Sequence, residues 1–195
     1  MMRIITGSAK GKKLLTLEGE ATRPTSERIK GAIFSSLQFD IESRRVLDLF
    51  AGCGQMGLEA LSRGADGCMF IDAARDAMEI VKENATRVGL ADKSRYLVSD
   101  YRNYIRKASG REKFDLVFID PPYSMECAVS AMIALAKGGM LLPGALVVLE
   151  TGTETVDAKS EELSDFELQK STSYGKMTSV NIFFYKGAGD APDAL

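Results

Sequence analysis

The most constraining feature of this sequence is a regular alternation of short apolar runs with segments of helical periodicity. Between the runs, apolar residues recur at helical spacing, most clearly at Ala77, Ile80, Val81 and Val88. Alternating strands and helices of this length predict a mainly parallel sheet that is covered on both faces. The five runs, each short enough for a buried strand, are 46–50, 68–71, 96–98, 116–119 and 146–149.

The two ends of the chain depart from this alternation. Residues 3–17 predict a small β-hairpin with a Gly-rich connection, and a helix is expected over 25–37. Near the other end, 166–174 and 178–186 leave no room for a helix between them and predict an antiparallel hairpin that turns at Gly175.

These patterns predict three parts in one chain of 195 residues. An N-terminal extension of hairpin and helix, with basic residues that face a substrate, is expected over 1–40. An α/β domain is expected over 41–186. The polar, Gly- and Pro-containing tail over 187–195 is expected to be disordered.

Composition excludes several chemistries. The chain has no histidine and three cysteines that form no C-x-x-C pair, so histidine triads, zinc fingers and other common metal sites are not expected. No apolar run approaches the ~20 residues of a membrane span, and the N-terminus does not read as a signal peptide. An odd number of widely spaced thiols suits a reducing compartment. We therefore expect a cytoplasmic protein with no metal and no membrane segment.

Charge is distributed unevenly along the chain. The first 30 residues carry a net charge of +4, whereas the rest carries −6. A basic arm on an acidic body indicates a contact with a polyanion such as nucleic acid. The alternative is that the lysines only keep an edge hairpin soluble. Charge alone leaves both interpretations open.

A glycine-rich loop follows the first predicted strand. Gly52, Gly54 and Gly57 form G-x-G-x-x-G, which lets the backbone approach a ligand closely at a helix N-terminus. Asp72 ends the next strand and could accept the two hydroxyls of a ribose. Asp48, just before the loop, would repel a pyrophosphate but attract an amino group or a sulfonium. The pattern therefore favours S-adenosylmethionine over a nicotinamide dinucleotide.

Two further polar residues occupy informative positions. Asp100 follows the third predicted strand, where a carboxylate could bind the amino edge of an adenine. Its alternative role is to cap the helix that follows. Asn84 lies on the apolar stripe of its helix, which predicts a buried amide that satisfies a neighbouring loop.

The fourth predicted strand runs into Asp120-Pro121-Pro122-Tyr123. The prolines fix the backbone and leave carbonyls without competing amide donors, so the Asp120 carboxylate and the Pro121 carbonyl form two acceptors beside an aromatic ring. Such a pair suits a planar –NH₂ group, whose lone pair it would aim at a methyl donor while Tyr123 stacks on a base. Asp120 could also receive the released proton. The alternative is a rigid turn that only ends the strand.

With these segments the chain resembles the RsmD family of bacterial ribosomal RNA methyltransferases. The R-P-T segment before an F-A-G loop is more specific than the glycine loop or D-P-P-Y, which occur in many amino-methyltransferases. The resemblance rests on Val46-Leu47-Asp48-Leu49-Phe50-Ala51-Gly52-Cys53-Gly54, on the run from Gly57 to Ala65, on Arg3-Ile4-Ile5, Gly7 and Lys10-Gly11-Lys12, on Arg23-Pro24-Thr25 with Arg28, on Asp120-Pro121-Pro122-Tyr123 and on Tyr174-Gly175.

The resemblance implies a Rossmann-like class I methyltransferase with a mainly parallel seven-stranded sheet. It implies transfer from S-adenosylmethionine to the N2 amine of a guanine in 16S ribosomal RNA. We further expect the substrate to be within a small-subunit particle and the protein to be a monomer. The cofactor would be bound by Asp48, Phe50, Gly52, Gly54, Asp72 and Asp100. The substrate would be bound by Lys10, Lys12, Arg23, Thr25, Arg28 and Tyr123, with Asp120, Pro121, Pro122 and Tyr123 catalytic.

Other functions stay open at this point. The same pocket could methylate adenine or cytosine in DNA or a glutamine amide in protein. The basic N-terminal arm favours nucleic acid, and the lack of a separate DNA-reading domain favours RNA. A nicotinamide-dependent oxidoreductase would use the glycine loop but leaves residues 120–123 unexplained. A non-catalytic RNA-binding assembly factor is the third class.

Overall fold

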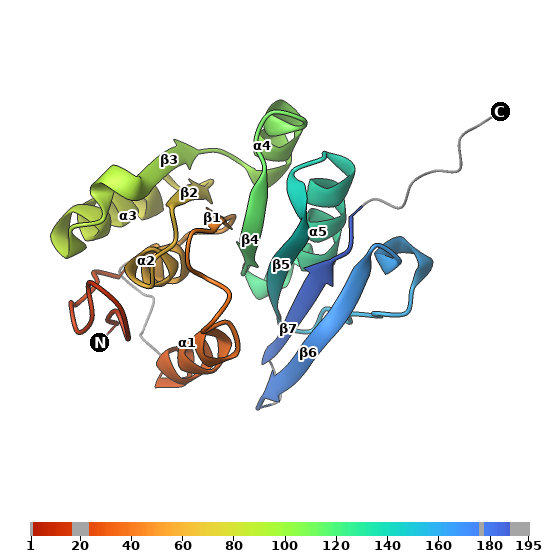
Figure 1. The fold of residues 1–195 in the computed structure, drawn as a ribbon, viewed down its shortest axis with the longest axis horizontal. Coiled ribbons are helices and arrows are strands. Elements are labelled where there is room, and N and C mark those ends of the chain that lie inside the picture. Colours follow the sequence, from red (N-terminus) through yellow and green to blue (C-terminus); the bar gives the residue numbers. More distant parts are fainter. Residues whose placement is uncertain (1, 17–23, 176–177, 188–195) are drawn as a thin grey trace. The chain divides into compact units, whose positions relative to one another are not determined.

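The computed structural model describes residues 2–16, 24–175 and 178–187, with the side chains of 24–26 left out (Figure 1). The chain divides into two compact units, Met1–Tyr104 and Ile105–Leu195, and the boundary lies within helix α4 (Tyr101–Ala108). The expected division at residue 40 stays a prediction. None of the described helices is long and apolar enough to cross a membrane.

The first unit contains three parallel strands in the order β3-β2-β1. Apolar side chains such as Leu47 and Phe70 are fully buried in β1 and β2, as the sequence predicts. The strands are β1 (Arg45–Asp48), β2 (Gly67–Asp72) and β3 (Ser94–Val98). They alternate with α2 (Gln55–Ser62), α3 (Arg75–Val88) and the short 3-10 helix η1 (Ala91–Lys93).

The predicted burial of the third strand is wrong. Leu97 and Val98 are 40% and 42% exposed, although β3 forms where the apolar run predicts a strand. The order β3-β2-β1 makes β3 an end strand, so that its apolar side chains have less cover than those of β2. Tyr96 is partly covered because its ring stacks on Phe70 with 5.9 Å between centroids.

The N-terminal hairpin is smaller than predicted, whereas the helix after it is confirmed as α1 (Pro24–Ser36). Within residues 2–16 the two arms pair only around an antiparallel bridge between Arg3 and Lys13, with backbone hydrogen bonds from Ile4 to Lys12, from Gly11 to Ile4 and from Leu14 to Met2. The pairing does not extend beyond Ile4, because the amides of Ile5 and Thr6 donate to the carboxylate of Glu59 on α2 instead of to a neighbouring strand. The residues between this segment and α1 lie outside the described part of the chain.

The second unit contains four strands in the order β4-β5-β7-β6. β4 and β5 are parallel, and β7 is antiparallel to both β5 and β6, which confirms the predicted C-terminal hairpin. The strands are β4 (Phe114–Ile119), β5 (Leu141–Thr151), β6 (Phe166–Tyr174) and β7 (Thr178–Tyr185). The helices are α5 (Ala128–Lys137) and the 3-10 helices η2 (Tyr123–Met125) and η3 (Glu161–Leu163).

β5 begins earlier than its apolar run predicts. Pro143 and Gly144, whose φ is 85°, interrupt the apolar pattern, and the pairing with β4 shifts register between Phe114 and Leu116. The buried run 145–149 then continues to Thr151, where the strand ends beside Gly152. Of the predicted disordered tail, only Gly187 lies within the described residues.

Candidate cofactor and substrate site

The first unit holds a buried carboxylate at the end of β1. Asp48 is 3% exposed, and its Oδ2 accepts a hydrogen bond of 2.9 Å from the amide of Gly57 in the first turn of α2. Burial raises the pKa of Asp48 to about 7, and the charge of Asp72 acts in the same direction while the Gly57 amide opposes it. A carboxyl group with such a pKa gains a negative charge readily when a cation binds beside it.

The three glycines after β1 serve different purposes. Gly52 and Gly54 have positive φ values of 52° and 79°, and a Cβ on Gly52 would meet no atom within 4 Å. Gly57 is different, because a Cβ there would lie 2.6 Å from the Cys68 sulfur and clash with the ring of Phe70. Gly57 therefore lets α2 pack closely on β2, whereas the backbone at Gly52 borders open space that a ligand can occupy.

Asp72 holds this loop in place. Its Oδ2 accepts from the amide of Gly52 at 2.9 Å, and its Oδ1 accepts from the amide of Ala74 at 2.8 Å. Each carboxylate oxygen has a second lone pair, so the half-buried side chain can still accept hydroxyl groups. The hydrogen bond between Gly52 and Asp72 thus connects the loop after β1 to the end of β2, and both residues are predicted to bind the cofactor.

Asp100 forms the helix cap that was its alternative interpretation. Its Oδ1 accepts from the amides of Arg102 and Asn103, at 2.9 and 3.3 Å, in the first turn of α4. The contact of an adenine with Asp100 stays a prediction. Phe50 lies nearby, because its ring packs at an angle on Tyr101 with 5.1 Å between centroids. The loop after β1 and the start of α4 therefore meet at this aromatic pair.

The prediction for Asn84 is confirmed. This fully buried amide donates to the carbonyls of Leu15 and Cys53 and accepts from the amide of Leu15 at 2.8 Å. One side chain therefore connects α3 to the N-terminal segment and to the glycine loop.

In the second unit, residues 120–123 follow β4 directly. Asp120 and Tyr123 are half-buried, Pro121 is buried, and the Pro122 carbonyl accepts from the amide of Met125 at 2.8 Å. The hydroxyl of Tyr123 donates to Glu150 Oε1 at 3.0 Å and lies 2.7 Å from the Thr178 hydroxyl. Burial raises the pKa of Tyr123 to about 12, so that the phenol keeps its proton at neutral pH.

Sequence reasoning missed Glu150 and Thr178. Glu150 follows the buried run of β5, and burial raises the pKa of its carboxyl group. A carboxylate directly after an apolar strand is the same signal that singled out Asp72, and it could have identified Glu150. Thr178 carries no such signal, because its partner lies 55 residues away in the sequence.

The predicted substrate residues have different surroundings. Lys10 and Arg28 are exposed. The ammonium group of Lys12 donates to the carbonyl of Val88 at 2.8 Å, so it caps the end of α3. Arg23 and the side chain of Thr25 lie outside the described residues. The structure therefore leaves Lys10 and Arg28 available to a polyanion and engages Lys12.

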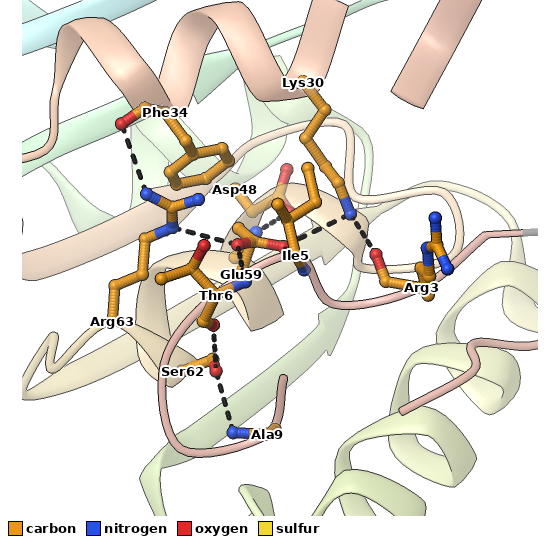
Figure 2. A network of polar contacts seen from close by, with 11 residues as sticks. Arg3, Ile5, Thr6, Ala9, Lys30, Phe34, Asp48, Glu59, Ser62 and Arg63 are labelled. Atoms are coloured by element: carbon orange, nitrogen blue, oxygen red, sulfur yellow. Dashed lines mark hydrogen bonds and ion pairs between the residues drawn. The ribbon is translucent and has the colours of Figure 1, made fainter. Parts of the chain in front are cut away.

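Glu59, which sequence reasoning did not single out, is fully buried in α2 and anchors the N-terminal segment (Figure 2). The amides of Ile5 and Thr6 donate to its two carboxylate oxygens at 2.7 and 3.0 Å. Arg63, one turn later, donates to Oε1 at 2.9 Å. The N-terminal segment lies against α2 in Figure 1, and α2 begins at the glycine loop. Both features thus depend on the same helix.

Lys30 on α1 completes this network. Its side chain is 1% exposed, its ammonium group lies 3.3 Å from Glu59 Oε2, and it donates to the carbonyl of Arg3 at 2.6 Å. Burial lowers the pKa of Lys30, although Glu59 opposes that effect. Lys30 therefore contributes to the positive count of the first 30 residues without presenting a charge at the surface.

A cavity of about 610 Å³ lies beside this network in the first unit. Polar side chains of Thr6, Ser35, Gln38 and Arg63 are among those that line it. None of the residues predicted to bind a cofactor or substrate does so.

Comparisons with known proteins place the chain in a family. A family model described as "Conserved hypothetical protein 95" matches residues 2–185. The chain is 33% identical over 187 residues to the putative rRNA methyltransferase YlbH of Bacillus subtilis, covering 95% of this chain and all of the relative. It is 32% identical to the ribosomal RNA small subunit methyltransferase D of Haemophilus influenzae over 77% of this chain and 78% of the relative.

Solved structures agree with this assignment. The putative methyltransferase yhhF of Escherichia coli superposes with a TM-score of 0.83 at 27% identity, over 96% of this chain and 99% of the other. A putative methylase of Haemophilus influenzae gives a TM-score of 0.78 at 27% identity, over 94% and 98%. The predicted Rossmann-like class I methyltransferase fold is thereby confirmed. By sequence and by fold, the chain belongs to the RsmD family of methyltransferases, the family of ribosomal RNA small subunit methyltransferase D.

Proposed function

We propose that this protein transfers a methyl group from S-adenosylmethionine to the exocyclic N2 amine of a guanine in 16S ribosomal RNA. The observation that carries the proposal is the identity of 32–33%, over most of the chain, to relatives named as ribosomal RNA methyltransferases. The D-P-P-Y segment after β4 supports an amine as the acceptor, because it combines a carboxylate and a proline carbonyl with an aromatic ring.

The residues of the first unit fit the proposed cofactor. S-adenosylmethionine, when bound, supplies an electrophilic methyl group on a positively charged sulfur. Asp48, with a pKa near 7, would bind the amino group of the cofactor's methionine part. The open space at Gly52 would let that methionine part lie against the protein backbone. Asp72 would accept the ribose hydroxyls, and Phe50 and Asp100 would border the adenine.

The residues of the second unit would hold the target base. The Asp120 carboxylate and the Pro121 carbonyl would accept the two amine hydrogens, which makes the nitrogen more pyramidal and directs its lone pair toward the methyl carbon. As the nitrogen–carbon bond forms, the bond between the methyl carbon and the sulfur would break and leave the sulfur as a neutral thioether, and Asp120 would take the proton that the nitrogen loses. Tyr123 would stack on the guanine, which must be unpaired or flipped out of its helix to reach these groups.

Basic residues of the N-terminal extension would bind the phosphates of the RNA. Lys10 and Arg28 are exposed. Together with Lys12, Arg23 and Thr25 they are the residues that we propose to bind the RNA. The proposed substrate is a partly assembled small-subunit particle, methylated by a monomer in the cytoplasm. Because phosphate contacts dominate RNA affinity, the proposed RNA-binding residues should make binding sensitive to salt.

The test is transfer of an isotopically labelled methyl group to defined substrates. Purified protein is mixed with labelled S-adenosylmethionine and, in separate reactions, with small-subunit particles, free 16S RNA and duplex DNA. Label in guanine N2 of 16S RNA, lost in Asp120→Ala while cofactor affinity stays within about twofold, is the expected result. Label in DNA or in adenine N6 would contradict the proposed substrate, and unchanged transfer by Asp120→Ala would contradict the catalytic assignment.

A further inference from the structure

We propose that Gly152, Glu150 and Thr178 are positioning residues that hold the ring of Tyr123 in one orientation, and we call their contacts with that ring the lock. Strand β7, which supplies Thr178, thereby helps to orient the proposed base-binding segment 120–123. The inference rests on the proposed function only for its consequence in catalysis. The lock itself is a property of the second unit, which contains all four residues.

The first contact is between Gly152 and the part of the Tyr123 side chain nearest its backbone, which is called the root of the ring below. A Cβ on Gly152 would lie 2.6 Å from Cγ, 2.8 Å from Cβ and 2.9 Å from Cδ2 of Tyr123. These atoms belong to the base of the aromatic side chain and cannot swing aside as the tip of a flexible chain could. Gly152 has no positive φ, so the need for glycine here is space alone. The ring therefore lies directly against the backbone that follows β5.

The second contact holds the tip of the ring from two strands. Glu150 at the end of β5 accepts the phenolic proton at 3.0 Å, and Thr178 at the start of β7 lies 2.7 Å from the same oxygen. Because the phenol has one proton and gives it to Glu150, the Thr178 hydroxyl donates to the phenol oxygen. A tyrosine has two freely rotating side-chain bonds, so contacts at the root and the tip leave it one orientation.

Strand pairing fixes the place of Thr178. It pairs with Tyr174 of β6, and the next residue, Ser179, pairs with Thr151 of β5. Thr151 lies between Glu150 and Gly152. The pairing of β7 with β5 therefore places Thr178 beside the two residues that make the other contacts with Tyr123. The C-terminal hairpin therefore has a role beyond closing the sheet, because it supplies one of the groups that orient Tyr123.

The lock has a direct consequence for the proposed reaction. A base stacked on Tyr123 takes its plane from the ring, and that plane determines where the amine lies relative to Asp120. A displacement of about 1 Å at a reacting centre can cost on the order of a hundredfold in rate. Disturbing Gly152 or Thr178 should thus reduce methyl transfer although neither residue touches the base.

A double-mutant cycle tests whether these residues act through Tyr123. We expect Gly152→Ala to lower methyl transfer about tenfold to hundredfold with cofactor affinity within about twofold of wild type. In a Tyr123→Ala background the same change should cost nothing further. Likewise, Thr178→Val should slow transfer in the wild type and have no effect in Tyr123→Phe. Equal losses in both backgrounds would overturn the inference.

Matched controls separate positioning from general damage. Gly67→Ala introduces a Cβ whose nearest neighbour is 3.6 Å away, and Thr172→Val makes the same change on β6 as Thr178→Val makes on β7. Both controls should leave transfer within about twofold of wild type. Losses in the controls as large as those in Gly152→Ala and Thr178→Val would assign the effect to folding and overturn the inference.

A second readout needs no enzymatic activity. In protein labelled on its six tyrosine rings, the NMR signal of Tyr123 is identified by its loss in Tyr123→Phe. We expect Thr178→Val and Glu150→Gln to shift that signal and Thr172→Val to leave it in place. If the wild-type protein methylates no substrate, the proposed function fails while this measurement still decides on the lock. A Tyr123 signal that none of the lock variants shifts would overturn the inference itself.

Discussion

The N-terminal segment and the C-terminal hairpin are attached to their units by different interactions. In the first unit, one buried carboxylate, Glu59, binds two amides of residues 2–16 and two cationic side chains, while Ser62 and Asn84 add further hydrogen bonds to the same segment. In the second unit, β6 and β7 are held by a long antiparallel ladder with one register shift between Leu168 and Lys170, and the polar contact at Tyr123 is an addition to it. The first attachment should therefore lose most of its strength when Glu59 alone is changed, whereas the second should weaken in steps.

The largest effect should follow removal of the Glu59 carboxylate. Glu59→Ala leaves Lys30 buried without its counter-ion and two amides without an acceptor, and breaking a buried ion pair costs about 3–5 kcal/mol. Urea unfolding measures the loss, with Glu79→Ala on the exposed face of α3 as the control. A loss no larger than that of the control would show that the network does not anchor the segment.

Next in size should be the loss of the Tyr123 ring. Tyr123→Ala should reduce methyl transfer about a hundredfold, because the base loses its stacking partner, and leave cofactor affinity within about twofold. Stability should change less than in Glu59→Ala, since the β5-β7 ladder stays intact. Titration calorimetry and a rate assay check this. An equal loss of cofactor affinity and rate would contradict the role of Tyr123 on the base.

A smaller effect should appear in the pH dependence of cofactor affinity. Binding of a cationic amino group requires ionised Asp48, so affinity should fall about tenfold between pH 8 and pH 6 if the pKa is about 7. Asp48→Asn should remove that dependence, and Glu59→Gln should keep it, although Glu59 lies on α2, the helix that Asp48 contacts through Gly57. A wild-type affinity that is independent of pH would contradict the placement of the amino group.

The same pKa has a consequence for stability. An acid whose pKa is raised in the folded state keeps its proton to higher pH than in the unfolded chain. Asp48 therefore lowers stability as pH rises from its ordinary pKa of 3.8 to about 7, and adds no further change above that window. Asp48→Asn should make the free energy of unfolding less dependent on pH in this range, as unfolding experiments at several pH values can measure.

The smallest effect should come from the exposed lysines of the N-terminal segment. Lys10→Gln and Lys13→Gln should each reduce the salt dependence of RNA affinity by about one phosphate contact. Lys12→Gln should also weaken the end of α3, whose last carbonyl it caps. An unchanged salt slope in the triple variant would remove this segment from the RNA interface.

Local patterns predicted the elements of the fold well. Apolar runs located five strands, and the turn at Gly175 separated the two strands of the C-terminal hairpin. The glycine loop and the role of Asn84 followed from the residue types at positions set by that alternation. Such signals lie within a few residues of each other, which is why a single sequence displays them.

The errors share a physical cause. Whether β3 is covered, and whether residues 3–17 pair as strands, depends on contacts with distant parts of the chain. Glu59 and Ile5 form a hydrogen bond although they are 54 residues apart in the sequence, and Tyr123 and Thr178 form one at a separation of 55 residues. A buried glutamate in an amphipathic helix and a threonine at a strand start look ordinary in the sequence. Only the tertiary structure shows that each supports a segment that the proposed function uses.

The most direct test of the proposed function is mass-spectrometric mapping of methylated guanines in 16S RNA from cells that lack this protein, complemented with wild type or with Asp120→Ala. We predict that one N2-methylguanine is absent without the protein, returns with wild type and does not return with Asp120→Ala. An identical set of methylated guanines in all three cell lines would contradict the assignment of this protein as a guanine-N2 methyltransferase.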